Sequence, residues 1–322
     1  MPEQVKHWIA QAMAGVSKDY GQAMGLLVAA QARAHELGEQ GLRVKAIVTE
    51  ARLALRRRPV VAVLARHRDA LRLARDSGLA EALYDAHLGQ ARTWADLDLP
   101  RPGLLASDRA AQCLPPGEAE QRLGWLALRA GLRSQAGDTE AADALYEHLL
   151  LQLQDHHGSP VHGATLHNRA CHLERSGRLD EALVQSQQAE AALGADDLAD
   201  SGLAADLVAC RVRILVGLGR PDEALAQGRA WLARQPVASA WVSGVWSALA
   251  EALLRQDDAP AADEANRRAR AIALQLGVPR TAPLLLQASR IARQLGQRSE
   301  SAQLSEQADA ETLTLQRLAQ AA

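Results

Sequence analysis

A short sequence pattern recurs at a nearly constant spacing in the second half of the chain. It consists of a glycine, a polar residue, a variable residue, one or two acids and an alanine, as in SGRLDEAL at 176–183 and LGRPDEAL at 218–225. One reference residue per copy gives successive spacings of 40, 42, 38 and 39 residues: Gly137, Gly177, Gly219, Asp257 and Gly296. A constant period near 40 indicates a repeat array, in which each unit packs on its neighbours. The 322 residues have room for about eight units.

The residues around the pattern predict that each unit is a helix, a tight turn and a second helix. Each glycine follows an apolar helical stretch, where a left-handed residue commonly ends a helix. Pro221 and Pro260 stand where the next helix begins, the position at which proline loses no hydrogen bond. Asp180 and Glu181 occupy the first turn of a second helix, where the helix dipole favours negative charge. Neither helix of a pair can bury its apolar stripe alone, so the pairs must stack.

Composition favours an all-α fold. The chain has no Phe and only 3 Tyr, whereas sheets favour aromatic and β-branched residues. Its apolar part is mostly Ala and Leu, which are strong helix formers. Proline positions and apolar periodicity predict eight helix pairs: 3–14 with 19–37, 40–57 with 59–77, 79–97 with 101–113, 117–136 with 138–155, 160–176 with 178–194, 198–218 with 220–234, 237–256 with 258–276, and 280–295 with 297–320.

The pairs are expected to form one continuous solenoid, because no long linker divides the chain. The repeat pattern is degenerate over 1–116 and clearer over 117–322, where the array ends in a capping helix. Three tryptophans are expected at packed positions between helices: Trp94, Trp231 and Trp246.

The repeats resemble the tetratricopeptide repeat (TPR) family, whose signature runs W-x2-L-G-x2-Y and then A-x3-F. The copy that resembles it best carries Trp246, Leu249, Ala250, Leu253, Ala262 and Ala269. The period is nearer 40 than the family's 34, as in the TPR-like sensor regions of bacterial regulators. The second-helix aromatic of the signature is replaced by Ser186, Gly228, Asn266 and Ser305. The resemblance implies a right-handed α-solenoid of about eight antiparallel helix pairs.

In this family the first helix of each pair lines a concave surface where partners bind. Carrying the groove-facing positions over copy by copy predicts a partner-binding groove formed by His167, Cys171, Glu174, Arg213, Glu251, Arg255, Arg290 and Arg293.

Three arginines fall at one equivalent position in consecutive copies: Arg129, Arg169 and Arg211. Arginine is suited to bidentate binding of carboxylates, so a ladder that holds an acidic peptide segment is one hypothesis. Arginines whose stems cover the seam between repeats are the alternative.

No catalytic motif is present. None of the three lysines follows a glycine, as a P-loop requires, and the chain contains no H-E-x-x-H or G-x-S-x-G. We therefore expect a non-enzymatic protein without a cofactor.

Six of the ten histidines lie within 148–172. His162, His167 and His172 are spaced by five residues, which rotates each away from the last on a helix. His167 and Cys171 do share a face, at a spacing of four. A polar loop and a helix surface explain the cluster best, so the sequence predicts no metal site.

Cysteine usage and hydropathy bear on location. Cys113, Cys171 and Cys210 are odd in number, far apart and without a C-x-x-C motif, which is typical of a reducing compartment. The least charged stretch, 237–250, is too short to span a bilayer. We expect a cytoplasmic protein with no membrane contact.

The net charge of the chain gives little information about its binding partners. With 36 basic and 38 acidic residues, the chain is not a general polyanion binder. The basic stretch 43–75 is a candidate nucleic-acid surface, although a solvated helix surface is the simpler explanation. The last helix carries a short heptad-like seam that predicts either a homodimer contact or a capping helix: Leu304, Ala308, Glu311, Leu315, Leu318 and Ala322.

Two functional hypotheses follow. The first is a non-enzymatic TPR-like module that presents a concave groove to a protein or peptide, for assembly or signal sensing. The alternative is the sensory, regulatory region of a bacterial signalling protein, a transcription regulator or a diguanylate cyclase, whose output domain is absent from this chain.

Overall fold

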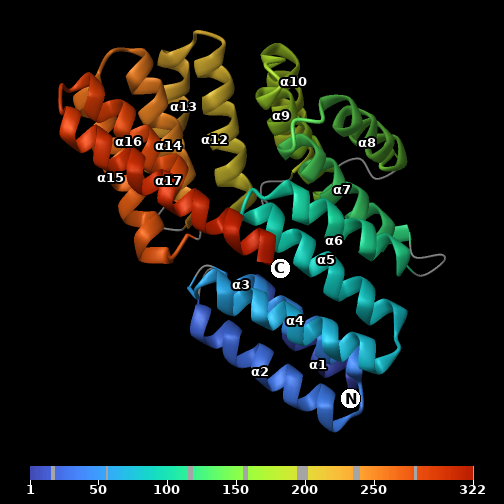
Figure 1. Ribbon diagram of the computed structural model, residues 1–322. Helices are drawn as coiled ribbons and strands as arrows, with labels where there is room; N and C mark the ends of the chain where they lie inside the picture. Colours follow the sequence, from blue (N-terminus) through green and yellow to red (C-terminus); the bar gives the residue numbers. More distant parts are fainter. Residues whose placement is uncertain are drawn as a thin grey trace. The chain divides into compact units, whose positions relative to one another are not determined.

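The regular structure of the chain is entirely α-helical. The computed structural model describes residues 1–15, 19–55, 57–114, 119–154, 159–193, 202–234, 240–278 and 281–321, and in these ranges it has sixteen α-helices and no strand (Figure 1). The helices are α1 (Pro2–Gly15), α2 (Tyr20–Glu36), α3 (Gln40–Ala54), α4 (Val60–Ser77), α5 (Ala80–Asp96), α6 (Pro100–Gln112), α7 (Ala119–Gln135), α8 (Thr139–Gln152), α9 (Pro160–Arg175), α10 (Leu179–Ala192), α12 (Gly202–Gly217), α13 (Pro221–Ala233), α14 (Ala240–Arg255), α15 (Ala259–Leu276), α16 (Ala282–Gln294) and α17 (Arg298–Ala321). Each predicted pair overlaps two of them, so the all-α class and the eight helix pairs are confirmed.

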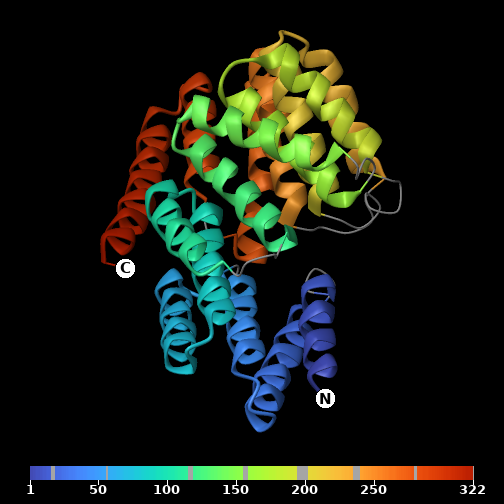
Figure 2. The same ribbon diagram turned by 90° about the vertical axis from the view of Figure 1, so that its right-hand side faces the viewer.

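The chain divides into two compact units, Met1–Asp138 with Leu318–Ala322, and Thr139–Arg317. Within the first unit, the first helices of successive pairs contact one another in the order α1, α3, α5 and α7. Within the second unit, α9, α12, α14 and α16 do the same. First helices also pack on second helices, as α1 on α2 in Figure 2 and α14 on α15 in Figure 1. Continuity of the solenoid and its right-handed twist stay predictions.

The turn between the two helices of a pair has one repeated geometry. Gly177 has a φ of 76°, and the N–H of Arg178 donates to the carbonyl of Leu173 at 2.9 Å. This is the Schellman arrangement that ends helices at a left-handed residue. The same bond and a positive φ recur at the reference residue of each copy: Gly137, Gly177, Gly219, Asp257 and Gly296.

Among the described turns that join the two helices of a pair, the structure adds a sixth copy of this geometry, at Asp98, 39 residues before Gly137. Asp98 has a φ of 54°, and the N–H of Leu99 donates to the carbonyl of Trp94 at 2.9 Å. The sequence pattern missed it because an aspartate replaces the glycine and Gly103 replaces the alanine that follows.

Small buried residues occupy two fixed positions in every copy, counted from the turn residue. The position seven residues before the turn holds Ala91, Ala130, Ala170, Val212, Ala250 and Ser289. The position five residues after it holds Gly103, Ala142, Ala182, Ala224, Ala262 and Ser301. In the last pair the Ser289 and Ser301 hydroxyls are 3.0 Å apart. The two positions therefore face each other where the helices of a pair come closest.

The tryptophans are packed to different degrees. Trp94 is fully buried, as predicted. Trp231 and Trp246 are only partly buried, at the edge of the core of the second unit. The Arg268 guanidinium lies 4.8 Å above the Trp246 ring and covers its outer face.

The last helix, α17, closes the second unit. The Glu311 carboxylate accepts hydrogen bonds from the backbone N–H groups of Thr281 and Ala282, at 2.7 and 3.0 Å, and so caps the start of α16. Leu304 packs against Ala288 and Ala292 of α16. These contacts within the chain favour the capping role of the seam. Ala322 lies outside the described residues, and dimerisation through this helix stays a prediction.

Among the described helices, none combines the length and the apolar character that crossing a bilayer requires.

Two glycines give a matched test of the close packing in the first unit. A Cβ at Gly89 on α5 would lie 2.0 Å from Val48 Cγ1, and the short branched valine leaves it little room to move. We expect Gly89→Ala to destabilise the protein by about 1–3 kcal/mol through overpacking. Gly131 on α7 has no atom within 4 Å of the added Cβ. Gly131→Ala should therefore stabilise by about 0.5–1 kcal/mol through helix propensity. Urea unfolding of both variants measures the difference, and effects of the same sign would contradict the packing.

Candidate functional site

The predicted groove residues lie on four neighbouring first helices of the second unit, which we call the first-helix face: α9, α12, α14 and α16. His167, Cys171 and Glu174 come from α9, and Arg213 from α12. Glu251 and Arg255 come from α14, and Arg290 and Arg293 from α16. Side-chain contacts join these residues into two groups, each built across a repeat boundary, one on α9 and α12 and one on α14 and α16.

Both groups contain the same ion pair. Arg213 donates from Nε and Nη2 to the two carboxylate oxygens of Glu174, at 2.8 and 2.9 Å. Arg290 donates to the Glu251 carboxylate, with the shorter bond at 2.7 Å. Each pair joins residues 39 positions apart, one repeat along the chain. The Arg255 guanidinium adds a contact at 3.8 Å to Glu251.

The arginines of this face are more accessible than the acids that they bind. The side chains of Arg255 and Arg290 are 65% and 58% exposed, whereas that of Glu251 is 21% exposed. Likewise Arg213 is 41% and Glu174 18% exposed. With Arg293, also exposed, the predicted groove set contains four arginines and two glutamates. Its accessible surface is therefore mainly guanidinium.

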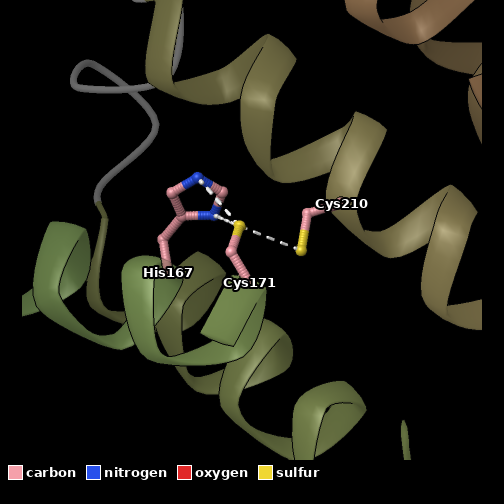
Figure 3. Close-up of side chains that lie close together, drawn as sticks. All are labelled: His167, Cys171 and Cys210. Carbon is pink, nitrogen blue, oxygen red and sulfur yellow. Dashed lines mark hydrogen bonds between the residues drawn. The ribbon is translucent and has the colours of Figure 1, made fainter. Parts of the chain in front are cut away.

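A cluster of two thiols and an imidazole lies beside the Arg213–Glu174 pair; we call it the His-Cys-Cys cluster. Figure 3 shows His167 and Cys171 projecting from α9 towards Cys210 of α12. The two sulfurs are 3.3 Å apart, and Cys171 Sγ is 3.8 Å from His167 Nε2. His167 and Cys210 are buried, and Cys171 is half-buried.

The cluster polarises its own groups. The hydrogen bond with Cys210 is the largest influence on Cys171 and holds the pKa of its thiol well below the usual value. The same bond, together with burial, raises the pKa of Cys210 well above it. Burial opposes protonation of His167, but the Cys171 sulfur outweighs burial and raises the pKa of the imidazole. Cys171 is thus the thiol that ionises first, opposite a histidine that favours its charged form.

The sequence linked His167 to Cys171 but not to Cys210. Cys210 lies 39 residues beyond Cys171, so only an alignment of adjacent repeats brings it to the same place. The placement of this histidine group on a helix surface is wrong for two members. His167 is buried, and His172 is buried with Nε2 3.4 Å from Asp143 Oδ1 and its ring against Tyr146.

The other histidines of the group differ in setting. His148 is exposed and hydrogen-bonds to Gln152, as expected of a helix surface. His162 is partly buried. His156 and His157 lie outside the described residues.

Each arginine of the predicted ladder binds a carboxylate of the preceding second helix. The pairs are Arg129 with Asp108, Arg169 with Glu147, and Arg211 with Glu190. Arg211 also donates to the Ser186 carbonyl at 3.0 Å. The arginine side chains are mostly covered. These contacts favour the seam-covering role, because the covered guanidinium groups leave an acidic ligand little access.

The basic stretch 43–75 covers most of α3 and α4 and the segment between them. Arg66 binds the buried Glu50 carboxylate at 2.5 Å and lies 3.5 Å from Asp69. Arg57 lies over the Tyr20 ring, 4.8 Å from its centroid. Part of this positive charge is therefore used within the chain, and nucleic-acid binding by this stretch stays a prediction.

Comparison with known proteins identifies the fold through structure alone. No protein-family model matches the chain, and no curated protein matches it. Among solved structures, it is similar to a tetratricopeptide repeat protein from Parabacteroides merdae ATCC 43184, with 15% identity and a TM-score of 0.51, covering 84% of this chain and 93% of that one. BtubC (BKLC) from P. vanneervenii matches with 18% identity and a TM-score of 0.47, covering 74% and 92%.

The chain therefore has a TPR-like helical repeat fold. Stacked repeats of this kind form extended surfaces.

The ion pairs of the first-helix face should contribute little to stability. Exposed pairs are worth about 0.2–1 kcal/mol, so we expect Arg213→Ala and Arg290→Ala each to lower the free energy of unfolding by less than about 1 kcal/mol. A double-mutant cycle on Glu174 and Arg213 in urea should give a coupling within the same range. A coupling of several kcal/mol would instead make this pair a structural brace of the array.

Proposed function

We propose that the chain is a non-enzymatic binding module whose first-helix face takes a protein or peptide segment rich in acidic side chains. The observation that supports this most is the accessible row of guanidinium groups on α12, α14 and α16. The carboxylates that accompany them lie underneath and are largely covered.

The physical argument concerns what a ligand meets at this face. An exposed arginine with one carboxylate partner still has N–H groups free for a second acceptor, since guanidinium carries five donors. Carboxylates on an extended or helical segment match this geometry in bidentate fashion. Neighbouring first helices present such groups in succession, so a segment laid across them makes several modest contacts at once. We infer a role in assembly or signal sensing through that partner.

A charge-reversal experiment tests the proposal. Proteins of the source organism would be captured on the immobilised chain, and the affinity of the enriched partner would then be measured for two double variants. Arg255→Glu with Arg290→Glu alters the first-helix face. Arg229→Glu with Arg267→Glu makes the same change in charge at exposed positions of the second helices α13 and α15.

We expect the first double variant to weaken binding at least tenfold and the second to leave it within about twofold. Affinity should also fall as salt is added, because exposed charges are screened. Equal effects of both variants, or none, would contradict the assignment of the face. Recovery of no protein, with binding of small anions instead, would favour the sensory-region alternative.

A further inference from the structure

The His-Cys-Cys cluster has a property that the protein-binding proposal does not use. Two thiols and an imidazole converge from two helices, with their ligand atoms all within 4.8 Å of one another: His167, Cys171 and Cys210. In sequence, Cys171 and Cys210 are separated by one repeat, and stacking of α9 on α12 brings them together. We propose that these three residues form a binding site for a thiophilic metal ion, Zn²⁺ in the first instance.

The distances suit tetrahedral coordination. With Zn–S near 2.3 Å and Zn–N near 2.0–2.1 Å, two sulfurs on one zinc ion lie about 3.8 Å apart, and a sulfur and a nitrogen about 3.6 Å apart. The two sulfurs are 3.3 Å apart, and Cys171 Sγ is 3.8 Å from His167 Nε2. Both ligand–ligand distances are within about 0.5 Å of the ideal values. The third distance, between the ligand atoms of His167 and Cys210, is at most 4.8 Å. A side-chain shift of about 1 Å brings it to the value for a shared zinc ion.

The donor set selects the class of ion. Two thiolates and an imidazole suit zinc and copper(I), whereas magnesium and calcium require oxygen ligands. Charge also favours a divalent ion, because two thiolates in a largely buried place need compensation. Zn²⁺ supplies it in full. Among the charged groups that act on the cluster, Glu174 and Arg213 neutralise each other, and Asp206 adds negative charge near His167.

A fourth ligand position stays open to water or to another molecule. Within the part of the chain that the structure describes, only three residues belong to the ligand group. Glu174 Oε2 lies 3.8 Å from Cys210 Sγ, but both of its oxygens are bound by Arg213. Glu174 therefore stands beside the site, next to a ligand, and not among the ligands.

This assignment revises the sequence-based prediction of no metal. That prediction considered histidines along one helix, where His162, His167 and His172 diverge. The site instead combines one histidine and one cysteine of α9 with a cysteine of the next repeat. A bound ion would tie these two consecutive helix pairs together.

Titration of the full chain with metal tests the proposal. The protein would be freed of metal with a chelator, kept reduced with a phosphine, and titrated with ZnCl₂ against a chromophoric competitor. Co²⁺ would serve as a spectroscopic substitute, because thiolate-to-cobalt charge transfer and strong visible bands report tetrahedral sulfur ligation. A parallel titration with copper(I) distinguishes the two thiophilic ions. We expect one ion per chain.

Variants locate the site. Cys171→Ser, Cys210→Ser and His167→Ala should each weaken Zn²⁺ binding by about 100-fold or more, beyond the 10- to 100-fold typical of residues that only support ligands. Cys113→Ser is the matched control and should bind like the unaltered chain. Since a ligand that binds only the folded state stabilises it, Zn²⁺ should also raise the thermal unfolding midpoint of the unaltered chain and of Cys113→Ser, but not of the three ligand variants.

Alkylation of the unaltered chain tests the same point without mutation. Bound Zn²⁺ should protect Cys171 and Cys210 from iodoacetamide and leave the reactivity of Cys113 unchanged, as read by peptide mass. Absence of binding to the fully reduced chain would overturn the proposal. Binding that survives Cys171→Ser or Cys210→Ser, or protection of all three cysteines alike, would overturn it too. The outcome is independent of any protein partner.

Discussion

The close approach of paired helices at small side chains is the constraint on which the rest of this structure depends. Seven residues before each turn and five residues after it, the side chains are small and buried, and in the last pair they touch as Ser289 and Ser301. A turn with a left-handed residue fixes where each helix ends, so the two small positions meet at the same height in every copy. The consequence is a constant register between repeats. Residues about 40 positions apart then lie side by side on neighbouring first helices, as both interhelical ion pairs and the two cysteines do.

The constant register between repeats explains two of the positions that depart from the TPR signature. Where the signature has an aromatic on the second helix, Gly228 allows so close a contact that an added Cβ would lie 2.6 Å from Leu249 Cδ2. At the equivalent place in the next copy, Asn266 is buried and donates to the Leu284 carbonyl and to Gln287 Oε1, at 3.1 and 2.9 Å. Gln287 in turn donates to the Ser247 carbonyl at 2.9 Å. Close packing or a buried hydrogen-bond network thus replaces the volume of an aromatic ring.

The sequence predicted the features of the fold that depend on residues within one helix pair. Glycine turns, first-turn acids and apolar periodicity act within one helix pair, and they located all eight pairs. The copy at Asp98 was missed because aspartate also adopts the left-handed conformation, so the turn survives without its glycine. The candidate site was predicted less well, because it depends on side chains from two repeats. His167 and Cys171 could be placed on one face from their spacing, whereas Cys210 and the burial of His172 depend on the stacking of neighbouring helices.

Glu174 connects the two proposals made for the first-helix face. Its carboxylate binds Arg213, which is accessible to a ligand, and one of its oxygens lies 3.8 Å from the Cys210 sulfur. An acidic group that draws Arg213 away leaves Glu174 without its cation beside a thiol that a metal ion needs as thiolate. A metal ion bound through that thiolate has the matching effect, because the negative sulfur beside Glu174 makes it harder to remove Arg213 from the carboxylate. The two events therefore act on one shared carboxylate, and by linkage each changes the affinity of the other by the same factor.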